Sequence, residues 1–460
     1  IMLGEGEEML PELLELHRSM KAEGASRAEM LRAMSHMHGV YVPSLYDMLD
    51  EVAAQQRGTW AVPRYEDVPA VIEKRLWDGF ADSDAYEPMI VPYTEVIHDR
   101  FNVEVLRGCT RGCRFCQAGM MYRPVRERSA DNIVSAVCRG LAETGYDEVS
   151  LTSLSSTDHS QIEQILRRLN RALEGKGISV SIPSQRLDSF GVEMAELVAG
   201  GKRGGLTFAP EAGTQRLRDV INKGVTEDDL FGAIDAAFAA GWRRCKLYFM
   251  IGLPTETDDD IKGIASLAQR AYDRAKKAVP ENQRGNVRVS ISCALFVPKS
   301  QTPFQWDGQI TPEEAKRRID LLRRSVKYRA VDVHWHEPDV SLVEAMMSRG
   351  GRDIAPLIEG AWRRGQRFDA WTEQFELSRW EEAAAELGMD LRALAQESFE
   401  LDWRLPWEHV SPGVSRGFLL REYRRSLEGV TTPDCTRESC TGCGVCPTLK
   451  ADNVLVGERA

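Results

Sequence analysis

Between residues 101 and 330 the sequence alternates short β-prone runs with longer amphipathic stretches, and this alternation constrains the fold more than any other feature of the chain. Repetition of strand and helix about six times predicts a parallel sheet with right-handed crossovers, either a doubly wound sheet or a whole or partial barrel. In both, the working loops follow the carboxyl ends of the strands. The predicted strands are 102–106, 148–152, 178–182, 205–208, 245–251 and 287–294, and the predicted helices are 130–143, 161–173, 190–199, 228–240, 258–278 and 312–327.

The flanking segments divide the 460 residues into further regions. We expect residues 1–100 to form helices and extended linker, and residues 331–430 to be mostly helical. Residues 431–460 are rich in glycine and cysteine and show no periodicity. The predicted domains are therefore 1–100, a core at 101–330, 331–430 and a tail at 431–460.

The composition excludes several classes of protein. A net charge of -11 argues against a general nucleic-acid coat or a basic membrane-surface protein. No apolar run approaches the ~18 residues of a membrane span. The first twelve residues are acidic, whereas a signal peptide begins with a basic segment. We therefore expect a cytoplasmic protein with no membrane partner.

The ten cysteines fall into two groups and three single positions. In a reducing compartment they are not expected to form disulfides. Cys138, Cys245 and Cys293 stand alone in apolar helical or strand patterns, which predicts packing thiols. The first group contains three cysteines within eight residues, and the second contains four within twelve: Cys109, Cys113 and Cys116, then Cys435, Cys440, Cys443 and Cys446.

The first group follows the first predicted strand in the sequence RGCTRGCRFCQAG. A structural zinc site closes its shell with four ligands, and a disulfide needs two cysteines. Three thiolates on a four-iron cube leave one iron free for another ligand. The group therefore predicts a metal centre with one open position, with zinc or a chance cluster as the alternative on spacing alone.

The spacing CxxxCxxC, with Phe115 just before the last cysteine, resembles the cluster loop of radical S-adenosylmethionine (radical SAM) enzymes. The resemblance implies a partial (β/α)6 barrel with this loop after its first strand, flanked here by a helical N-terminal extension, a helical C-terminal region and a Cys-rich tail. It also implies a 4Fe–4S cluster on Cys109, Cys113 and Cys116. The open iron would bind SAM, and an electron from a donor such as flavodoxin or ferredoxin would cleave SAM to a 5'-deoxyadenosyl radical.

The same resemblance assigns SAM-binding roles to residues that follow later strands. The motifs SLSS, PSQRLD, APEAGT and GLPTET each come directly after a predicted strand. Taken singly, GLPTET is also compatible with a helix-capping turn, Glu211 with a cap or surface carboxylate, and the NKG segment at 222–224 with a plain loop. The candidate cofactor-binding residues are Phe115, Ser153, Ser155, Ser184, Arg186, Glu211, Ile251 and Gly252.

The tail group supplies four thiolates, and its last three cysteines followed by Pro447 resemble ferredoxin spacing. A second iron–sulfur cluster and structural zinc both fit this pattern. Its role remains open among electron relay, substrate anchoring and stapling of the tail.

Other segments resemble an uncharacterised cobalamin-binding type of radical SAM enzyme. These are GEGE at residues 4–7, YVPS at 41–44, LPW at 405–407 and the cysteine tail. The first hundred residues would then include the remnant of a cobalamin domain, and cobalamin would be used only if such a domain exists outside this sequence. We expect an oxygen-sensitive enzyme that modifies RNA or a small metabolite, with methylation as a candidate reaction. The alternative is a non-catalytic, metal-stapled interaction module, RNA-associated or otherwise.

Overall fold

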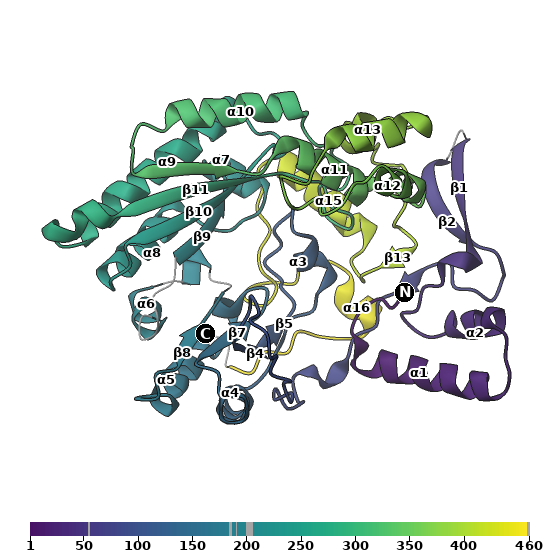
Figure 1. Ribbon diagram of the computed structural model, residues 1–460, viewed down its shortest axis with the longest axis horizontal. Coiled ribbons are helices and arrows are strands. Elements are labelled where there is room, and N and C mark those ends of the chain that lie inside the picture. The colour runs from purple at the N-terminus through teal and green to yellow at the C-terminus, as the bar shows by residue number, and fades with distance from the viewer. Residues whose placement is uncertain (54–55, 184–185, 190, 199–205, 458–460) are drawn as a thin grey trace.

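A computed structural model describes residues 1–53, 56–183, 186–189, 191–198 and 206–457. Its core contains seven parallel strands in two sheets (Figure 1). One sheet has the order β4-β7-β8, and the other has the order β12-β11-β10-β9. The α/β class with parallel sheets is therefore confirmed. The strands are β4 (Phe101–Glu104), β7 (Glu148–Thr152), β8 (Ser179–Ser181), β9 (Leu206–Glu211), β10 (Arg244–Ile251), β11 (Arg288–Leu295) and β12 (Val331–Trp335).

Helices follow the strands and cover the outer faces of both sheets (Figure 1). Their apolar stripes and the buried strand residues form one large core, which includes Val103, Leu151, Phe208, Leu247 and Ile291. Buried and more exposed residues alternate along β10 and β11, as the alternation of apolar and polar residues in the predicted strands indicates. The covering helices are α4 (Ala130–Thr144), α5 (Ile162–Ala172), α6 (Val192–Val198), α8 (Glu227–Ala239), α9 (Asp258–Ala278) and α10 (Pro312–Ser325), with short α7 (Gln215–Val220) before α8.

Polar caps fix where several of these helices begin. The Ser129 hydroxyl accepts a hydrogen bond from the Asn132 amide at the start of α4. Thr226 and Asp229 form a reciprocal capping box at the start of α8, and Thr257 and Asp260 form another at α9. Such caps satisfy amides that have no partner inside the helix. Because the helices begin at these caps, the loops at the carboxyl ends of the strands lie outside the helices.

The N-terminal region contains α1 (Gly6–Ala22) and α2 (Arg27–Met34), as expected from the sequence. It also contains an antiparallel hairpin, β1 (Tyr46–Ala53) and β2 (Gln56–Pro63), which the sequence interpretation placed in helices or linker. A short strand, β3 (Ile72–Glu73), pairs with β13 (Val410–Ser411). The first hundred residues therefore contact the C-terminal region, which the predicted domain boundaries did not anticipate.

The C-terminal region is mostly helical, in agreement with the sequence prediction. Its helices form a second buried cluster around Leu342, Leu357 and Trp380. Within the described part of the chain, no helix has the length and apolar character to cross a membrane. The remaining elements are β5 (Leu106–Arg107), α3 (Gln117–Met121), β6 (Arg126–Glu127), α11 (Pro338–Arg349), α12 (Ile354–Arg363), α13 (Leu377–Glu386), α14 (Leu391–Gln396), α15 (Arg416–Leu427) and α16 (Val445–Leu449), with 3-10 turns at Pro43–Leu45, Asp78–Phe80, Ser156–Asp158, Leu187–Ser189 and Glu281–Asn286.

The packing of α4 on the first strand makes Gly140 a test of the fold. A Cβ atom at Gly140 would lie 2.0 Å from the ring of Phe101, whereas one at Gly232 in α8 would meet nothing within 4 Å. We expect Gly140→Ala to lower the free energy of unfolding by about 1–3 kcal/mol through overpacking. Gly232→Ala should raise it by up to about 1 kcal/mol through helix propensity. Urea denaturation measures both, and equal effects at the two positions would contradict this packing.

Candidate active site

The three-cysteine loop runs from β5 to α3, at the carboxyl end of the first parallel strand. Gly108 adopts a φ of +93°, and a Cβ atom there would lie 2.3 Å from the carbonyl oxygen of Pro124. Gly112 adopts a φ of +76° between the first two cysteines. Positive φ is open to glycine at little cost. The two glycines therefore allow the chain to bend tightly enough to bring three thiols to one side.

Asn222 binds this loop. It follows α7, which comes after strand β9 of the four-stranded sheet. Its side-chain amide nitrogen donates to the carbonyl oxygen of Gly112 at 3.1 Å and to that of Thr432 at 3.1 Å. Its amide oxygen accepts from the backbone N–H of Thr432 at 2.8 Å. Asn222 is buried and has a φ of +51°, a conformation that asparagine tolerates better than most residues. One side chain thus ties the loop to the C-terminal tail.

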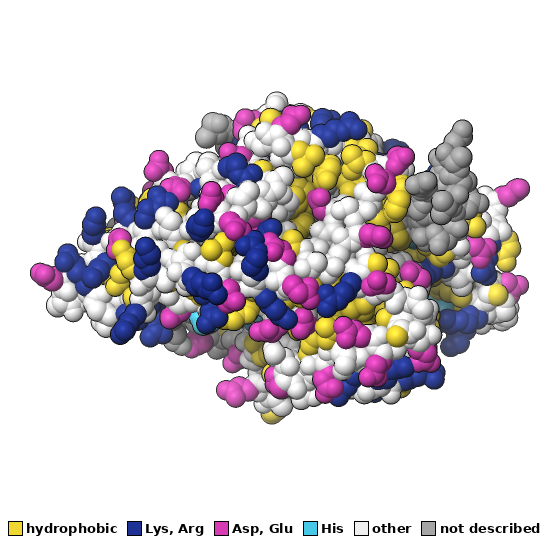
Figure 2. All heavy atoms as spheres, turned by 90° about the horizontal axis from the view of Figure 1, so that it is seen from above, with side chains coloured by type: hydrophobic (Ala, Val, Ile, Leu, Met, Phe, Trp, Pro, Cys, Tyr) yellow, Lys and Arg dark blue, Asp and Glu magenta, His cyan; other side chains and the backbone are white. Residues whose placement is uncertain are grey.

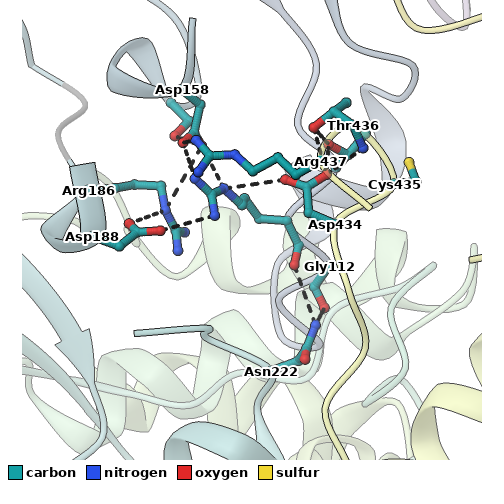
Figure 3. A network of polar contacts seen from close by, with 12 residues as sticks. Gly112, Asp158, Arg186, Asp188, Asn222, Asp434, Cys435, Thr436 and Arg437 are labelled. Carbon is teal, nitrogen blue, oxygen red and sulfur yellow. Dashed lines mark hydrogen bonds and ion pairs between the residues drawn. The ribbon is translucent and has the colours of Figure 1, made fainter. Parts of the chain in front are cut away.

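A network of charged side chains surrounds the same loop (Figure 3). Arg111 donates to Asp158 through Nε at 2.9 Å and pairs with Asp188 at 3.0 Å and Asp434 at 3.4 Å. Asp158 also pairs with Arg437 at 3.1 Å. Burial alone would raise the pKa of Asp158, but the guanidinium groups of Arg111 and Arg186 hold its pKa below the usual value. The loop is therefore fixed by ion pairs to both the barrel and the tail.

The loop is also fixed by a fully buried ion pair. Arg114 has no exposed surface, and its guanidinium donates to the Glu422 carboxylate of α15 at 3.1 Å. It also donates to the carbonyl oxygens of Val220 at 2.8 Å and Val430 at 2.7 Å. A buried charge needs such a set of partners to offset its lost hydration. Arg114 therefore anchors the middle of the loop between the second and third cysteines.

The three thiols lie close enough to affect one another. Burial, and then the neighbouring Cys113 thiol, raise the pKa of Cys109 to about 12, and Cys116 also contributes. Burial and Cys113 likewise raise the pKa of Cys116. A thiol must lose its proton to ligate a metal, so metal binding here would release protons.

Two cations and a carboxylate lie beside these thiols. Burial lowers the pKa of Lys223, but the Glu211 carboxylate and the Cys113 thiol outweigh that effect and the net shift is upward. Lys223 Nζ donates to Glu211 Oε1 at 3.0 Å. Cys113 also acts on Arg186, together with Asp188 and Asp158. The structure therefore brings two sequence-predicted residues, Arg186 and Glu211, together with the cysteine loop.

In the described part of the chain, no three His, Cys, Asp or Glu side chains are grouped to hold one metal ion. Metal ligation by the three thiols therefore stays a prediction.

Ser153 and Ser155 form the turn after β7. The Ser153 hydroxyl lies 2.7 Å from that of Ser156 and accepts from the Ser155 amide at 3.1 Å. The Ser155 hydroxyl donates to Asp158 at 2.6 Å. Both hydroxyls therefore shape the turn that presents Asp158 to Arg111. Their predicted contact with SAM stays a prediction.

Among the other predicted cofactor residues, Ile251 ends β10 and Gly252 follows it. Gly252 has a φ of +93°, and its amide donates to Glu256 at 2.7 Å. Ile251 is fully buried in the main core. Phe115 packs against a small apolar cluster that includes Leu253 and so links the cysteine loop to the GLPTET turn. Ser184 lies outside the described residues.

The tail cysteines lie beside this site, although they are more than three hundred residues away in sequence. Asp434, which precedes Cys435, accepts a hydrogen bond of 2.6 Å from the hydroxyl of Thr110. Cys443 is buried, Cys435 and Cys446 are partly buried, and Cys440 is exposed. Of the single cysteines, Cys245 and Cys293 are buried as predicted, and Cys138 is partly buried.

Sequence interpretation missed the residues that hold the loop in place. Asn222 and Lys223 were assigned to a plain loop, and Arg111, Asp158 and Asp434 were given no role. Their partners are distant in sequence, so no local pattern reveals them. The available signal was the asparagine before a Lys-Gly pair, because asparagine readily adopts a left-handed turn.

Comparison with known proteins agrees with this geometry. Residues 103–268 match the family model of the radical SAM superfamily, and residues 1–43 match that of the N-terminal part of radical SAM proteins. An uncharacterized protein of Methanocaldococcus jannaschii is 29% identical over 314 residues, 66% of each chain. A second, from Methanopyrus kandleri, is 25% identical over 250 residues, 52% of this chain and 47% of its own. The chain thus spans between about half and two thirds of the length of these relatives.

More distant relatives include proteins with named activities. A putative methylthiotransferase of Methanocaldococcus jannaschii is 23% identical over 167 residues, 34% of this chain and 36% of its own. Among solved structures, the radical S-adenosylmethionine methyltransferase TsrM from Kitasatospora setae has 15% sequence identity and a TM-score of 0.42, covering 64% of this chain and 52% of its own.

The bridging amide of Asn222 can be tested by Asn222→Gly, which keeps the left-handed backbone accessible. We expect the free energy of unfolding to fall by about 2–4 kcal/mol, because buried carbonyl and amide groups of the loop and tail lose their partners. Phe368→Gly is the matched control, since Phe368 also has a positive φ of +56° but is 73% exposed. Urea denaturation should show little loss in the control, and a comparable loss in both would contradict the bridging role.

Glu256 gives the GLPTET turn a pH dependence. Burial raises the pKa of Glu256 to about 7, despite its bonds to the Gly252 amide and to Arg318 at 2.6 Å. The folded state then binds the proton more tightly than the unfolded state, so this stabilisation is complete below about pH 4.5 and is lost as the pH rises through about 7. Relative to Glu256→Gln, the wild type should lose about 1–3 kcal/mol of unfolding free energy between pH 4.5 and 8. A pH-independent difference in urea denaturation would show that Glu256 stays ionised.

Proposed function

The chain is a radical SAM protein, and on this premise we propose that it is an enzyme that holds a 4Fe–4S cluster through Cys109, Cys113 and Cys116. We further propose that it cleaves SAM reductively to 5'-deoxyadenosine while it modifies a substrate. The observation that carries this proposal is a glycine-bent loop that gathers three thiols beside Glu211, Lys223 and Arg186. When bound, the cluster would supply one electron and an open iron to SAM.

The residues around the loop would keep this chemistry in one geometry. Asn222, Arg111 and Arg114 bind the loop from three directions, and their contacts are largely buried. Fixed positions for the three thiols would hold a bound cluster in one place. The buried contacts around the loop would also limit access of water and oxygen to it.

The charged residues beside the thiols fit the polar parts of SAM. A carboxylate such as that of the methionine moiety would be matched by the cations of Arg186 and Lys223. Glu211 would accept hydrogen bonds from an ammonium or from ribose hydroxyls. We assign Ser153, Ser155 and Ser184 to further polar contacts. Phe115, Ile251 and Gly252 would provide the apolar side of the pocket for the adenine ring.

The substrate is proposed only as a class, RNA or a small metabolite. The net charge is -11, and on the face in Figure 2 basic and acidic side chains are interspersed. Recognition of RNA through a broad basic surface is therefore not supported on that face. A cavity of about 580 Å³ is lined by Gly108 at the start of the cysteine loop and by Ser153 in the turn after β7. Its size suits a small molecule or a single extruded base.

The same cavity is lined by the GEGE turn at residues 4–7. Glu5 pairs with Arg126 at 2.5 Å and with Arg107 at 3.0 Å, directly before the cysteine loop. Methylation is our candidate reaction, since relatives include a putative methylthiotransferase and an uncharacterized methyltransferase. Cobalamin is a candidate cofactor only for a polypeptide that carries a cobalamin domain outside these 460 residues. The electron would come from a reductant such as flavodoxin or ferredoxin.

The proposal is tested by anaerobic reconstitution with iron and sulfide, followed by dithionite and SAM. We expect wild type to form 5'-deoxyadenosine and the Cys109→Ala/Cys113→Ala/Cys116→Ala variant to form none above background. Cys138→Ala, which removes a thiol outside both groups, should retain the wild-type yield. Chromatography of the quenched mixture quantifies the product.

Two results would contradict the proposal. A wild-type protein that binds a full cube but forms no 5'-deoxyadenosine, even with cobalamin and candidate substrates added, would indicate a structural cluster. A colourless protein loaded with zinc at this loop would support a non-catalytic, metal-stapled interaction module instead.

A further inference from the structure

The four tail cysteines lie within twelve residues of a tail that has little hydrophobic core. Between residues 431 and 457 only Cys443 and Val445 are buried hydrophobic residues, and the one helix, α16, has five residues. The thiols of Cys443, Cys435 and Cys440 all act on Cys446, whose pKa is raised mainly by burial. Segments that lack a core usually need a disulfide or metal to hold one shape. The described tail has no disulfide.

Local bonds already orient two of these sulfurs. The Gly442 amide donates to Cys440 Sγ at 3.4 Å, and the Asn453 side chain donates to Cys435 Sγ at 3.6 Å. Gly442 and Gly444 adopt φ values of +66° and +95° on either side of Cys443. N–H groups directed at cysteine sulfurs stabilise thiolates rather than thiols.

Two buried cations lie against this group. Lys74 Nζ donates to the carbonyl oxygens of Met121 and Arg123, both at 2.5 Å. Burial lowers the pKa of Lys74 to about 7, and Glu5 and the Cys443 thiol oppose that shift. Arg123 is 2% exposed and donates to the carbonyl oxygen of Gly119 at 2.9 Å. It acts in turn on Cys435.

The hydrogen bonds of Lys74 and Arg123 go to carbonyl oxygens and not to a carboxylate. Arg123 Nη1 is buried and has no hydrogen-bond partner among the described residues. No salt bridge joins Lys74 or Arg123 to an acidic side chain within the described chain, although Glu5 contributes to the field at Lys74. Buried charges normally have a partner of opposite sign. A metal centre with four thiolates carries a net negative charge and would supply that partner.

We propose that Cys435, Cys440, Cys443 and Cys446 ligate a second metal centre, which Lys74 and Arg123 neutralise and which holds the tail against the three-cysteine loop. The chemistry is that of a soft metal with four thiolates, either an iron–sulfur cube or zinc.

The contacts of the tail link this proposed metal centre to the three-cysteine loop. Asp434, just before Cys435, contacts Thr110 and Arg111 of the three-cysteine loop. Arg437, just after it, pairs with Asp158, the partner of Arg111 in the turn after β7. Beyond the last cysteine, Val454 exchanges backbone bonds with Val125 and Glu127, at 2.8 and 2.9 Å, just after that loop. The tail thus encloses the first site from two sides. A metal that fixes the tail would also fix the geometry of the first site.

The proposed metal centre in the tail does not depend on the proposed function. Its effect on the three-cysteine site, the first site, does rest on that function. The two are separated in the Cys109→Ala/Cys113→Ala/Cys116→Ala variant, which has no first site. After anaerobic reconstitution and desalting, we expect this variant to retain about four irons with matching acid-labile sulfide. If the protein is offered both iron and zinc and retains one zinc per chain, the tail centre is a zinc site. Retention of neither metal would overturn the proposal.

Substitution of Cys440, the most exposed of the four, perturbs packing least. Added to the triple variant, Cys440→Ser should abolish stoichiometric retention, while Cys138→Ser should not. Lys74→Met in the triple variant should release the metal to a chelator about tenfold faster, since loss of a second-layer partner typically weakens metal binding 10–100-fold. An unchanged metal content after Cys440→Ser would contradict ligation by the tail.

The effect on the first site is tested in the otherwise wild-type chain. With Cys440→Ser, limited proteolysis should cut the tail at least several-fold faster than in Cys138→Ser, with fragments identified by mass spectrometry. Iron retained by the first site should fall as well. Equal proteolysis and equal first-site iron in the two variants would show that the tail metal does not support the loop.

Discussion

A loop that gathers three thiols within eight residues has no hydrogen-bonded ladder of its own, so groups elsewhere must determine its shape. In this protein the buried Asn222 side chain is one such group, because its amide forms hydrogen bonds with backbone groups of both the loop and the tail. Arg111 and Arg114 add charge-assisted bonds on the two flanks. The positions of Arg186, Glu211 and Lys223 relative to the thiols all depend on this attachment.

The arrangement also explains why so many charges are buried near one edge of the barrel. Each ion pair costs desolvation and is retained only with good geometry. Asp158, Asp188 and Asp434 come from three separate segments and converge on Arg111. Such a network favours one arrangement of the segments over alternatives that would leave a charge unpaired. Specific positioning, rather than net stability, is its main physical result.

The sequence was sufficient to locate the parallel strands and their helices, because apolar periodicity and polar caps are local properties. The motifs at strand ends likewise followed from the alternation. Two of their residues, Arg186 and Glu211, interact electrostatically with the cysteines, and their contacts with SAM stay predictions. The hairpin of β1 and β2 was missed because no Asn-Gly or similar turn signal separates the two strands. Asn222 and Asp434 were missed because their partners are 110 and 324 residues away.

The pairing of Val454 with the segment just after the three-cysteine loop has a consequence for biosynthesis. The barrel strands can pair as they leave the ribosome, but the enclosure of the loop must wait for more than three hundred further residues. Contacts of such long sequence separation form late, since the entropy of closing the chain is lost before they are gained. The nascent core therefore passes through a stage in which its three thiols are not yet enclosed by the tail.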